Sequence, residues 1–533
     1  MRQLSDADWT MLAMDTPNAQ NQVSMIQIYD PSTRQGGRLG FDEILRFIES
    51  RLDIARSFRE RLLQVPLSLD RPWWVSDPNF DLEFHVRELA LPDPGDWRQF
   101  CTQVARIASR PLDLTRPPWE MYVIERLNGI KQFPKGCFAL MIKMHHAAID
   151  GVSGIQIMSA LHDLSPRPAR RKPAGKWKPD AMPSALDLLR RAARTGFFRP
   201  VDLARMTLPT LMSLRRGGTS TPPQIPKRGL LQAVTRFNAP VSGHVVWGSS
   251  FTLFEDVKRI RAAVPDVKVN DVAMAIISGA MRRYLADKQE LPKSPMIALM
   301  PIALRATQTQ QKPGAPVETP AAGNSFVMTP VSMATEVSDP IERLLQIRDA
   351  TRDAKDYGAR SAKALMSLAQ TAIGGLNGSV QRAVISALNR AGRAPLHTIV
   401  TNVPGPQVPI YFCGARALYT TGSGPVVNGI GLFHGIGSYG GYMNICFSSD
   451  RVMMPDPEFY EQCIDRSVAE LLKGAKRLSK PRRSVKGTST TPQKSAKQGG
   501  QAARRKSSRT GSAEVAAPVK PAKPRGQAAS PTS

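Results

Sequence analysis

Residues 137–151 read CFALMIKMHHAAIDG, an apolar run that ends in two histidines, an aspartate and a glycine. The run over residues 137–144 has the length and composition of a buried strand. The pair Asp150-Gly151 is typical of a tight turn. We therefore predict that a strand carries an imidazole to the mouth of a cleft, where a turn redirects the chain. An imidazole that is largely neutral near neutral pH indicates proton transfer.

The flanking residues predict a hairpin before the histidines and a helix after them. Residues 122–127 form a second strand pattern, and a turn-rich segment at 128–136 separates it from residues 137–144. This spacing predicts an antiparallel pair. After Gly151, apolar residues recur at helical spacing at Val152, Ile155, Met158 and Leu161. The site is therefore predicted at a strand-to-helix junction.

The rest of residues 1–164 predicts one mixed α/β unit. Ser5 is expected to be the N-cap of a first helix. Apolar periodicity predicts further helices at 41–52 and 96–109, with strands at 23–29 and 73–75. The basic segment at 56–62 is interpreted as a solvated helix face.

Residues 237–472 predict a second α/β unit. The expected strands lie at 245–253, 297–305, 397–403, 408–420, 429–438 and 441–449, and the expected helices lie at 254–263, 272–285, 339–356, 361–390 and 456–473. Asn270 stands where the second of these helices begins, and local sequence favours it as the N-cap.

The net charge of +28 lies outside these two units. A linker at 165–236 holds sixteen Lys or Arg and three Asp, which gives +13, and a tail at 473–533 holds sixteen Lys or Arg and one Glu, which gives +15. The two units are thus neutral on balance, unlike a nucleic-acid-binding domain. The tail is poor in large apolar residues and is predicted to be disordered. Weak contact of the tail with nucleic acid is left open.

The middle of the linker, residues 184–216, mixes leucines and phenylalanines with arginines. A basic amphipathic helix can lie on an anionic lipid surface. It can equally be a linker helix clamped on the neighbouring units, because an amphipathic pattern alone does not separate the two. Both interpretations stay open.

The cysteines and the N-terminus predict a cytoplasmic protein. Five cysteines are scattered without a Cys-x-x-Cys pair, which is typical of reduced thiols. The first residues carry charges early and lack a secretory apolar run. No apolar stretch has the length of a spanning helix, so any membrane contact is expected to be peripheral.

Four motifs in this order resemble one family. They are His145-His146-x-x-x-Asp150-Gly151, Pro117-Pro118-Trp119-Glu120 upstream, Asn270-Asp271 at a helix start, and Asn402-Val403-Pro404-Gly405-Pro406 downstream. Together they resemble the bacterial wax ester synthase/acyl-CoA:diacylglycerol acyltransferases. The histidine motif alone is shared with peptide-synthetase condensation domains and other chloramphenicol-acetyltransferase-like proteins. The family usually has Pro-Leu-Trp at residues 117–119 and Val-Leu-Ala at residues 273–275, so acceptor and acyl length are left open.

The resemblance implies an α/β fold of two chloramphenicol-acetyltransferase-like domains with a tunnel between them. It implies transfer of an acyl group from long-chain acyl-CoA to diacylglycerol or a fatty alcohol, which makes triacylglycerol or wax ester. Acyl-CoA would be a substrate, so no cofactor is expected. The expected location is cytoplasmic, at a membrane or lipid-granule surface. Two alternatives are an amide-forming condensation enzyme and a non-enzymatic coat or tether that uses the basic linker and tail.

Carried onto this sequence, the resemblance makes His146 the general base. Adjacent strand residues face opposite ways, so His145 is expected to support it. Asp150 is predicted to hold the loop, as a helix N-cap or as the partner of a buried arginine, for which Arg305 is the candidate. Gly151 would supply the tight turn. A metal site is disfavoured because further ligands at suitable spacing are lacking.

Five other residues complete the expected site, and one of them, Asn270, stands at a helix start. Asn270 could donate to an oxyanion or act structurally. Trp119 is expected at the tunnel wall or an interface. The turn of Asn402, Pro404 and Gly405 is expected to form a rigid wall or domain contact.

Overall fold

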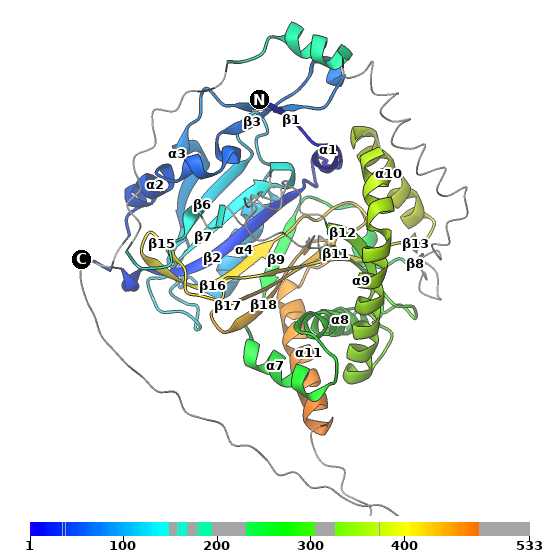
Figure 1. Cartoon of the computed structure of the whole chain (residues 1–533). Helices are drawn as coiled ribbons and strands as arrows, with labels where there is room; N and C mark the ends of the chain where they lie inside the picture. Colours follow the sequence, from blue (N-terminus) through cyan, green and yellow to red (C-terminus); the bar gives the residue numbers. More distant parts are fainter. Residues whose placement is uncertain are drawn as a thin grey trace, which may run out of the picture. The chain divides into compact units, whose positions relative to one another are not determined.

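The computed structural model describes residues 1–34, 36–37, 39–148, 157–158, 160–167, 179, 181–194, 231–303, 326–371 and 374–478. The chain from Met1 to Pro481 forms one compact unit. Two large sheets dominate this unit, and helices cover them (Figure 1).

The first sheet has six strands in the order β15-β16-β2-β7-β6-β5. Their bounds are Tyr411–Phe412, Ala415–Ser423, Gln22–Asp30, Phe138–His145, Trp119–Glu125 and Val86–Ala90. Strands β6 and β7 pair antiparallel, with Trp119 opposite Met144, so the predicted hairpin before the histidines is confirmed. All eight residues of β7 are buried, because both faces of this sheet are covered.

Alternate residues of β7 enter different cores. Leu140 and Ile142 pack with Ile44 and Ile48 of helix α2 (Phe41–Glu49). Met141 packs on the other face with apolar residues of helix α4 (Trp97–Ser109), which a capping box at Asp96 begins. Side chains that enter the same core therefore recur every second residue in the strand and about every 3.6 residues in the helices, as the sequence pattern predicts.

The basic segment at 56–62 is not a helix face, and that prediction is wrong. It forms a short 3₁₀ turn, η3 (Arg56–Phe58), and strand β3 (Glu60–Leu63), which pairs with β4 (Trp73–Ser76). Strand β1 (Arg2–Gln3) joins β4 on its other side. Phe58, Glu60 and Leu62 are buried in alternation with more exposed arginines, which is the period of a strand.

The second sheet has the order β10-β18-β17-β14-β11-β12, and β9 pairs with β18. The bounds, in chain order from β9, are Val245–Ser249, Thr252–Leu253, Ile297–Ala303, Phe326–Ser332, Thr398–Pro404, Leu432–Tyr439 and Tyr442–Asp450. Strands β11, β14 and β17 run parallel, and the remaining pairs are antiparallel. A short pair, β8 (Gln232–Ala233) and β13 (Arg393–Ala394), lies apart.

This second part of the chain also contains helices α7 (Phe254–Ala263), α8 (Val269–Asp287), α9 (Pro340–Thr371), α10 (Gly374–Arg390) and α11 (Pro457–Leu478). Helix α8 lies in the main core, with Val272, Ile276 and Ile277 fully buried. The predicted break at 357–360 is wrong, because α9 continues through it. The single Gly358 costs a helix only about 1 kcal/mol.

Strand β16 joins the two parts of the chain. It comes from beyond residue 400, yet it pairs along its length with β2, from Arg416 opposite Asp30 to Ser423 opposite Ser24 (Figure 1). The first sheet therefore needs strands from both predicted units. No described helix is both long enough and apolar enough to cross a membrane.

Candidate functional site

The two histidines stand where β7 ends. His145 is the last residue of β7, and His146 begins the 3₁₀ turn η5 (His146–Ala148). The backbone N–H of His145 donates to the Pro118 carbonyl at 2.9 Å, and that of His146 donates to the Asn21 carbonyl at 2.7 Å. The residues just before β6 and β2, the strands on either side of β7, thus hold the backbone of the pair.

His145 uses both ring nitrogens within the protein. Its side chain is fully buried, and its Nε2 lies 2.8 Å from Oδ2 of Asp15. The backbone N–H of Ala147 donates to its Nδ1 at 3.2 Å. Since a backbone N–H can only donate, Nδ1 is the acceptor and Nε2 carries the proton. His145 is therefore neutral and has no ring nitrogen left for a substrate.

His146 keeps a neutral imidazole for another reason. It is half-buried, and burial lowers the pKa of its imidazole below the ordinary value. The backbone carbonyl of His146 itself raises this pKa, whereas the nearby His145 lowers it further. A neutral imidazole at neutral pH can accept a proton.

The loop before β2 joins both histidines, and nothing in the sequence pattern pointed to it. Oδ1 of Asp15 accepts from the backbone N–H of Asn21 at 2.8 Å and from its Nδ2 at 3.1 Å. The carbonyl of the same Asn21 holds the backbone of His146. From α10, Nη1 of Arg382 donates to the Asp15 carbonyl at 3.0 Å. One carboxylate therefore orients the ring of His145 and also fixes the residue that holds His146.

A buried ion pair behind β7 was also missed by the sequence pattern. Lys143 is fully buried, with its Nζ 3.1 Å from Oε2 of Glu120. The same Nζ donates to the carbonyls of Ile107 and Arg110, at 3.2 and 2.9 Å, at the end of α4. Burial lowers the pKa of Lys143, and Glu120 opposes this shift. The amine thus ties the C-terminus of α4 to the histidine strand.

Trp119 lies in the core of the first sheet. It is fully buried and stacks on His85, with ring centroids 4.4 Å apart. Its Nε1 donates to the Phe58 carbonyl at 3.0 Å. Asn402, in β14, lies next to Asn270 in the first turn of α8, since Asn402 Nδ2 donates to Asn270 Oδ1 at 3.1 Å. The structure therefore brings together two of the motifs that the sequence singled out.

The N-cap interpretation of Asn270 is wrong. Helix α8 begins at Val269, so Asn270 is already inside the first turn and Lys268 is the N-cap. Oδ2 of Asp271 accepts from the backbone N–H of Lys268 at 2.8 Å. The neighbouring Asp271 thus accepts the hydrogen bond of a backbone N–H at the helix start. The side-chain amide of Asn270 is not needed for this and can bind other partners.

The turn after β14 makes a close backbone contact. Pro404 is the last residue of β14, opposite Ser438 of β17. A Cβ on Gly405 would lie 2.3 Å from the Ser438 carbonyl oxygen, so only glycine fits there. Asp150, Gly151 and Arg305 lie outside the described residues, and their expected roles stay predictions.

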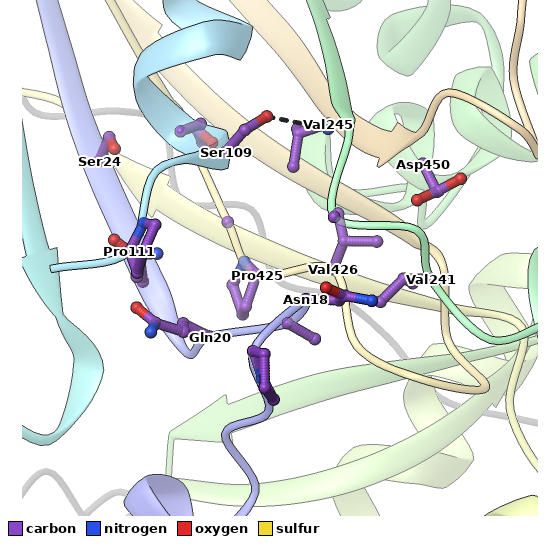
Figure 2. Close-up of a pocket in the computed structure, with 17 residues that line it drawn as sticks. Asn18, Gln20, Ser24, Ser109, Pro111, Val241, Val245, Pro425, Val426 and Asp450 are labelled. Atoms are coloured by element: carbon purple, nitrogen blue, oxygen red, sulfur yellow. Dashed lines mark hydrogen bonds between the residues drawn. The ribbon is translucent and has the colours of Figure 1, made fainter.

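A pocket lies near the start of β2, and its roughly 550 Å³ of empty space includes the open solvent at its mouth (Figure 2). It is lined by segments of both sheets, including Gln20, Gln22, Ser109, Val245 and Pro425. The Ser109 hydroxyl accepts from the Val245 backbone N–H at 3.0 Å and so links α4 to β9. Gln22 is opposite His145 in the ladder, but neither histidine lines this pocket. Within the described ranges, no three His, Cys, Asp or Glu side chains gather as a metal site would require.

Comparisons with known proteins identify the family. Residues 4–273 match the wax ester synthase/diacylglycerol acyltransferase catalytic domain, and residues 322–472 match the WS/DGAT C-terminal domain. Two proteins of Mycobacterium tuberculosis assigned as diacylglycerol O-acyltransferases are similar. One is 31% identical, and the match covers 85% of this chain and 93% of the relative. The other is 29% identical, and the match covers 86% of this chain and 87% of the relative.

The fold agrees with a solved member of that family. The structure of a wax ester synthase/diacylglycerol acyltransferase from Marinobacter aquaeolei covers 89% of this chain and 100% of its own, with a TM-score of 0.63 at 20% identity. The predicted fold class is thereby confirmed. From its catalytic and C-terminal matches and its relatives, the chain belongs to the wax ester synthase/diacylglycerol acyltransferase family and is an acyltransferase.

Proposed function

We propose that this acyltransferase moves an acyl group from long-chain acyl-CoA to the hydroxyl of diacylglycerol or a long-chain fatty alcohol, with His146 as the general base. The products are triacylglycerol or wax ester. The observation that carries the proposal is the half-buried imidazole of His146, whose pKa is lowered by burial, on a turn that the Asn21 carbonyl holds. Acyl-CoA is itself consumed, so the reaction takes no cofactor.

In this mechanism His146 accepts the proton of the acceptor hydroxyl as its oxygen attacks the thioester carbonyl. A C–O bond forms and the carbonyl oxygen becomes an oxyanion. When the intermediate collapses, the C–S bond breaks and the imidazolium returns the proton to the CoA thiolate. General base catalysis of this kind contributes about 10²–10⁴ in rate.

The oxyanion needs a hydrogen-bond donor, and Asn270 is our candidate. Its Oδ1 is occupied by Asn402, which orients the amide. The Nδ2 lies 3.8 Å from Sδ of Met300, a weak acceptor. This donor can therefore be given to a substrate oxygen at little cost, which supports the catalytic over the purely structural role.

The proposal is tested by purified His146→Ala, assayed with a long-chain acyl-CoA against diacylglycerol and against a fatty alcohol. We expect kcat to fall by about 10²–10⁴ with both acceptors. His244→Ala is the matched control, because the His244 side chain is exposed and has no part in the proposed mechanism. Retained activity of the His146 variant with both acceptors would contradict the mechanism.

A further inference from the structure

The loop between β3 and β4 exposes two leucines. We call residues 66–69 the leucine tip. Leu67 is 88% exposed and Leu69 is 60% exposed. Leu67 has φ 57° and ψ 15°, a left-handed conformation that is an outlier for a bulky residue, and Ser68 follows with φ 52°. Strain of this kind persists only where the surroundings impose it.

The surroundings of the leucine tip are well anchored. Val65 and Asp70, on either side of it, are each only 2% exposed. Oδ2 of Asp70 accepts from Nε2 of Gln3 at 2.8 Å, and the Ser68 N–H donates to the Val65 carbonyl at 2.9 Å. The anchored loop therefore keeps two leucine side chains exposed to solvent. Exposure of apolar surface costs free energy unless another surface covers it.

A short helix at residues 185–194, which we call the linker helix, lies against the same hairpin. Ser184 and Asp187 form its capping box. Leu188 and Ala192 are buried, and the Arg191 guanidinium lies 5.6 Å from the centre of the Trp73 ring at the start of β4. Figure 1 shows this helix, in teal, on the same side as strands β1 and β3.

The outer face of the linker helix combines apolar and basic side chains. Leu186, Arg190 and Arg194 follow at helical spacing away from the buried pair, and all three are exposed. Leu186 is 56% exposed, and Met182 just before the helix is 41% exposed. Apolar residues beside arginines, without a matching excess of acids, suit a surface that is apolar inside and anionic outside.

We propose that the leucine tip and the outer face of the linker helix form a docking surface for an anionic phospholipid layer. Leu67, Leu69 and Leu186 would enter the acyl region, while Arg190 and Arg194 would pair with the headgroups. The inference rests on the proposed function in one respect, because diacylglycerol and fatty alcohols reside in such layers.

The test compares binding of the full-length chain to vesicles of mixed anionic and zwitterionic lipid with binding to purely zwitterionic vesicles. The tail at 473–533 carries a charge of +15 and would attract anionic lipid by charge alone, so binding is also measured at about 0.5 M salt, where exposed charges are strongly screened. We expect Leu67→Ser/Leu69→Ser to lower the partition coefficient about tenfold or more, at low and at high salt. We expect Arg190→Gln/Arg194→Gln to lower it about tenfold on anionic vesicles at low salt only.

The matched control is Leu253→Ser/Val452→Ser, which changes two apolar residues that are 52% and 77% exposed elsewhere. It should bind as the unchanged protein does. Two results would overturn the proposal. One is wild-type lipid binding by the leucine variant. The other is a leucine variant that loses dimerisation of the protein and keeps its lipid binding. Esterification of a short-chain alcohol without vesicles should stay unchanged in every surface variant. Failure of the docking surface is therefore distinct from failure of the His146 mechanism.

Discussion

The adjacent residues His145 and His146 have different chemical tasks because different groups surround them. His145 is held between the carboxylate of Asp15 and the N–H of Ala147, which fixes its tautomer. His146 has its pKa lowered by burial. The protein thus keeps both imidazoles neutral, one as a fixed hydrogen-bond donor and the other as a proton acceptor.

Asp15→Asn tests the fixed tautomer. The amide oxygen would still accept from Asn21, which turns the NH₂ group toward Nε2 of His145. The ring proton would then move to Nδ1, where it faces the Ala147 N–H. We expect kcat to fall by about 10–100-fold with a small change in KM, since misplacement of a catalytic group by about 1 Å costs up to this much.

Steady-state kinetics with both acceptors checks the Asp15 prediction. Asp53→Asn is the control, because the Asp53 side chain is 47% exposed. Unchanged kcat in the Asp15 variant would show that the tautomer of His145 has no bearing on the reaction. A lowered melting temperature with unchanged kcat would assign Asp15 to folding alone.

The lowered pKa of His146 predicts the pH dependence of the reaction. The neutral imidazole is the active form, and the ordinary pKa of histidine is near 6.5. Since burial lowers this value, activity should persist below pH 6.5 and should be lost as the pH falls through the lowered pKa. The acid limb of kcat/KM against pH measures it. A midpoint above pH 6.5 would contradict the assignment.

Among the elements, those with a clear apolar period were predicted and those fixed by distant contacts were not. The β6 and β7 hairpin, α4 and α8 follow from residue spacing, although the N-cap of α8 is Lys268 and not the predicted Asn270. Strand β3 was mistaken for a helix because its arginines masked a period of two. Asp15 could not be found, because it lies 130 residues before its partner His145. The shared sheet needs β16, which no local pattern assigns to β2.

The Lys143 and Glu120 pair predicts a large loss of stability on truncation. Lys143→Ala leaves the Glu120 carboxylate buried without its amine, although Arg87 still lies 3.2 Å away. We expect unfolding to become easier by about 3 kcal/mol. Urea unfolding followed by circular dichroism measures this. Adding Glu120→Gln should recover part of the loss, and a double variant less stable than the single one would argue against the charge explanation.

At the scale of the whole molecule, the two matched domains share a sheet. Without β16, strand β2 would become the edge of the first sheet and would expose nine residues without a neighbouring strand. Exposed edges of this length promote aggregation. The predicted boundaries at 164 and 237 therefore divide the chain in sequence, while the first sheet crosses them.

Expression of residues 1–236 alone tests this dependence. We expect the fragment to aggregate, and co-expression with residues 237–533 to yield a folded complex, since the second fragment supplies β16. Size-exclusion chromatography separates the outcomes. A monomeric, folded fragment of residues 1–236 would show that β2 needs no partner from the second part.

Strand β16 also has a mechanical consequence. It is hydrogen-bonded to β2 on one side and contacts β17 and β18 of the second sheet. A displacement of the second sheet would therefore reach β2 through the hydrogen bonds between β16 and β2. The residue just before β2 is Asn21, whose carbonyl holds the backbone of His146. The backbone of His146 is thus linked to the second sheet through Asn21, β2 and β16, although these segments lie far apart in the sequence.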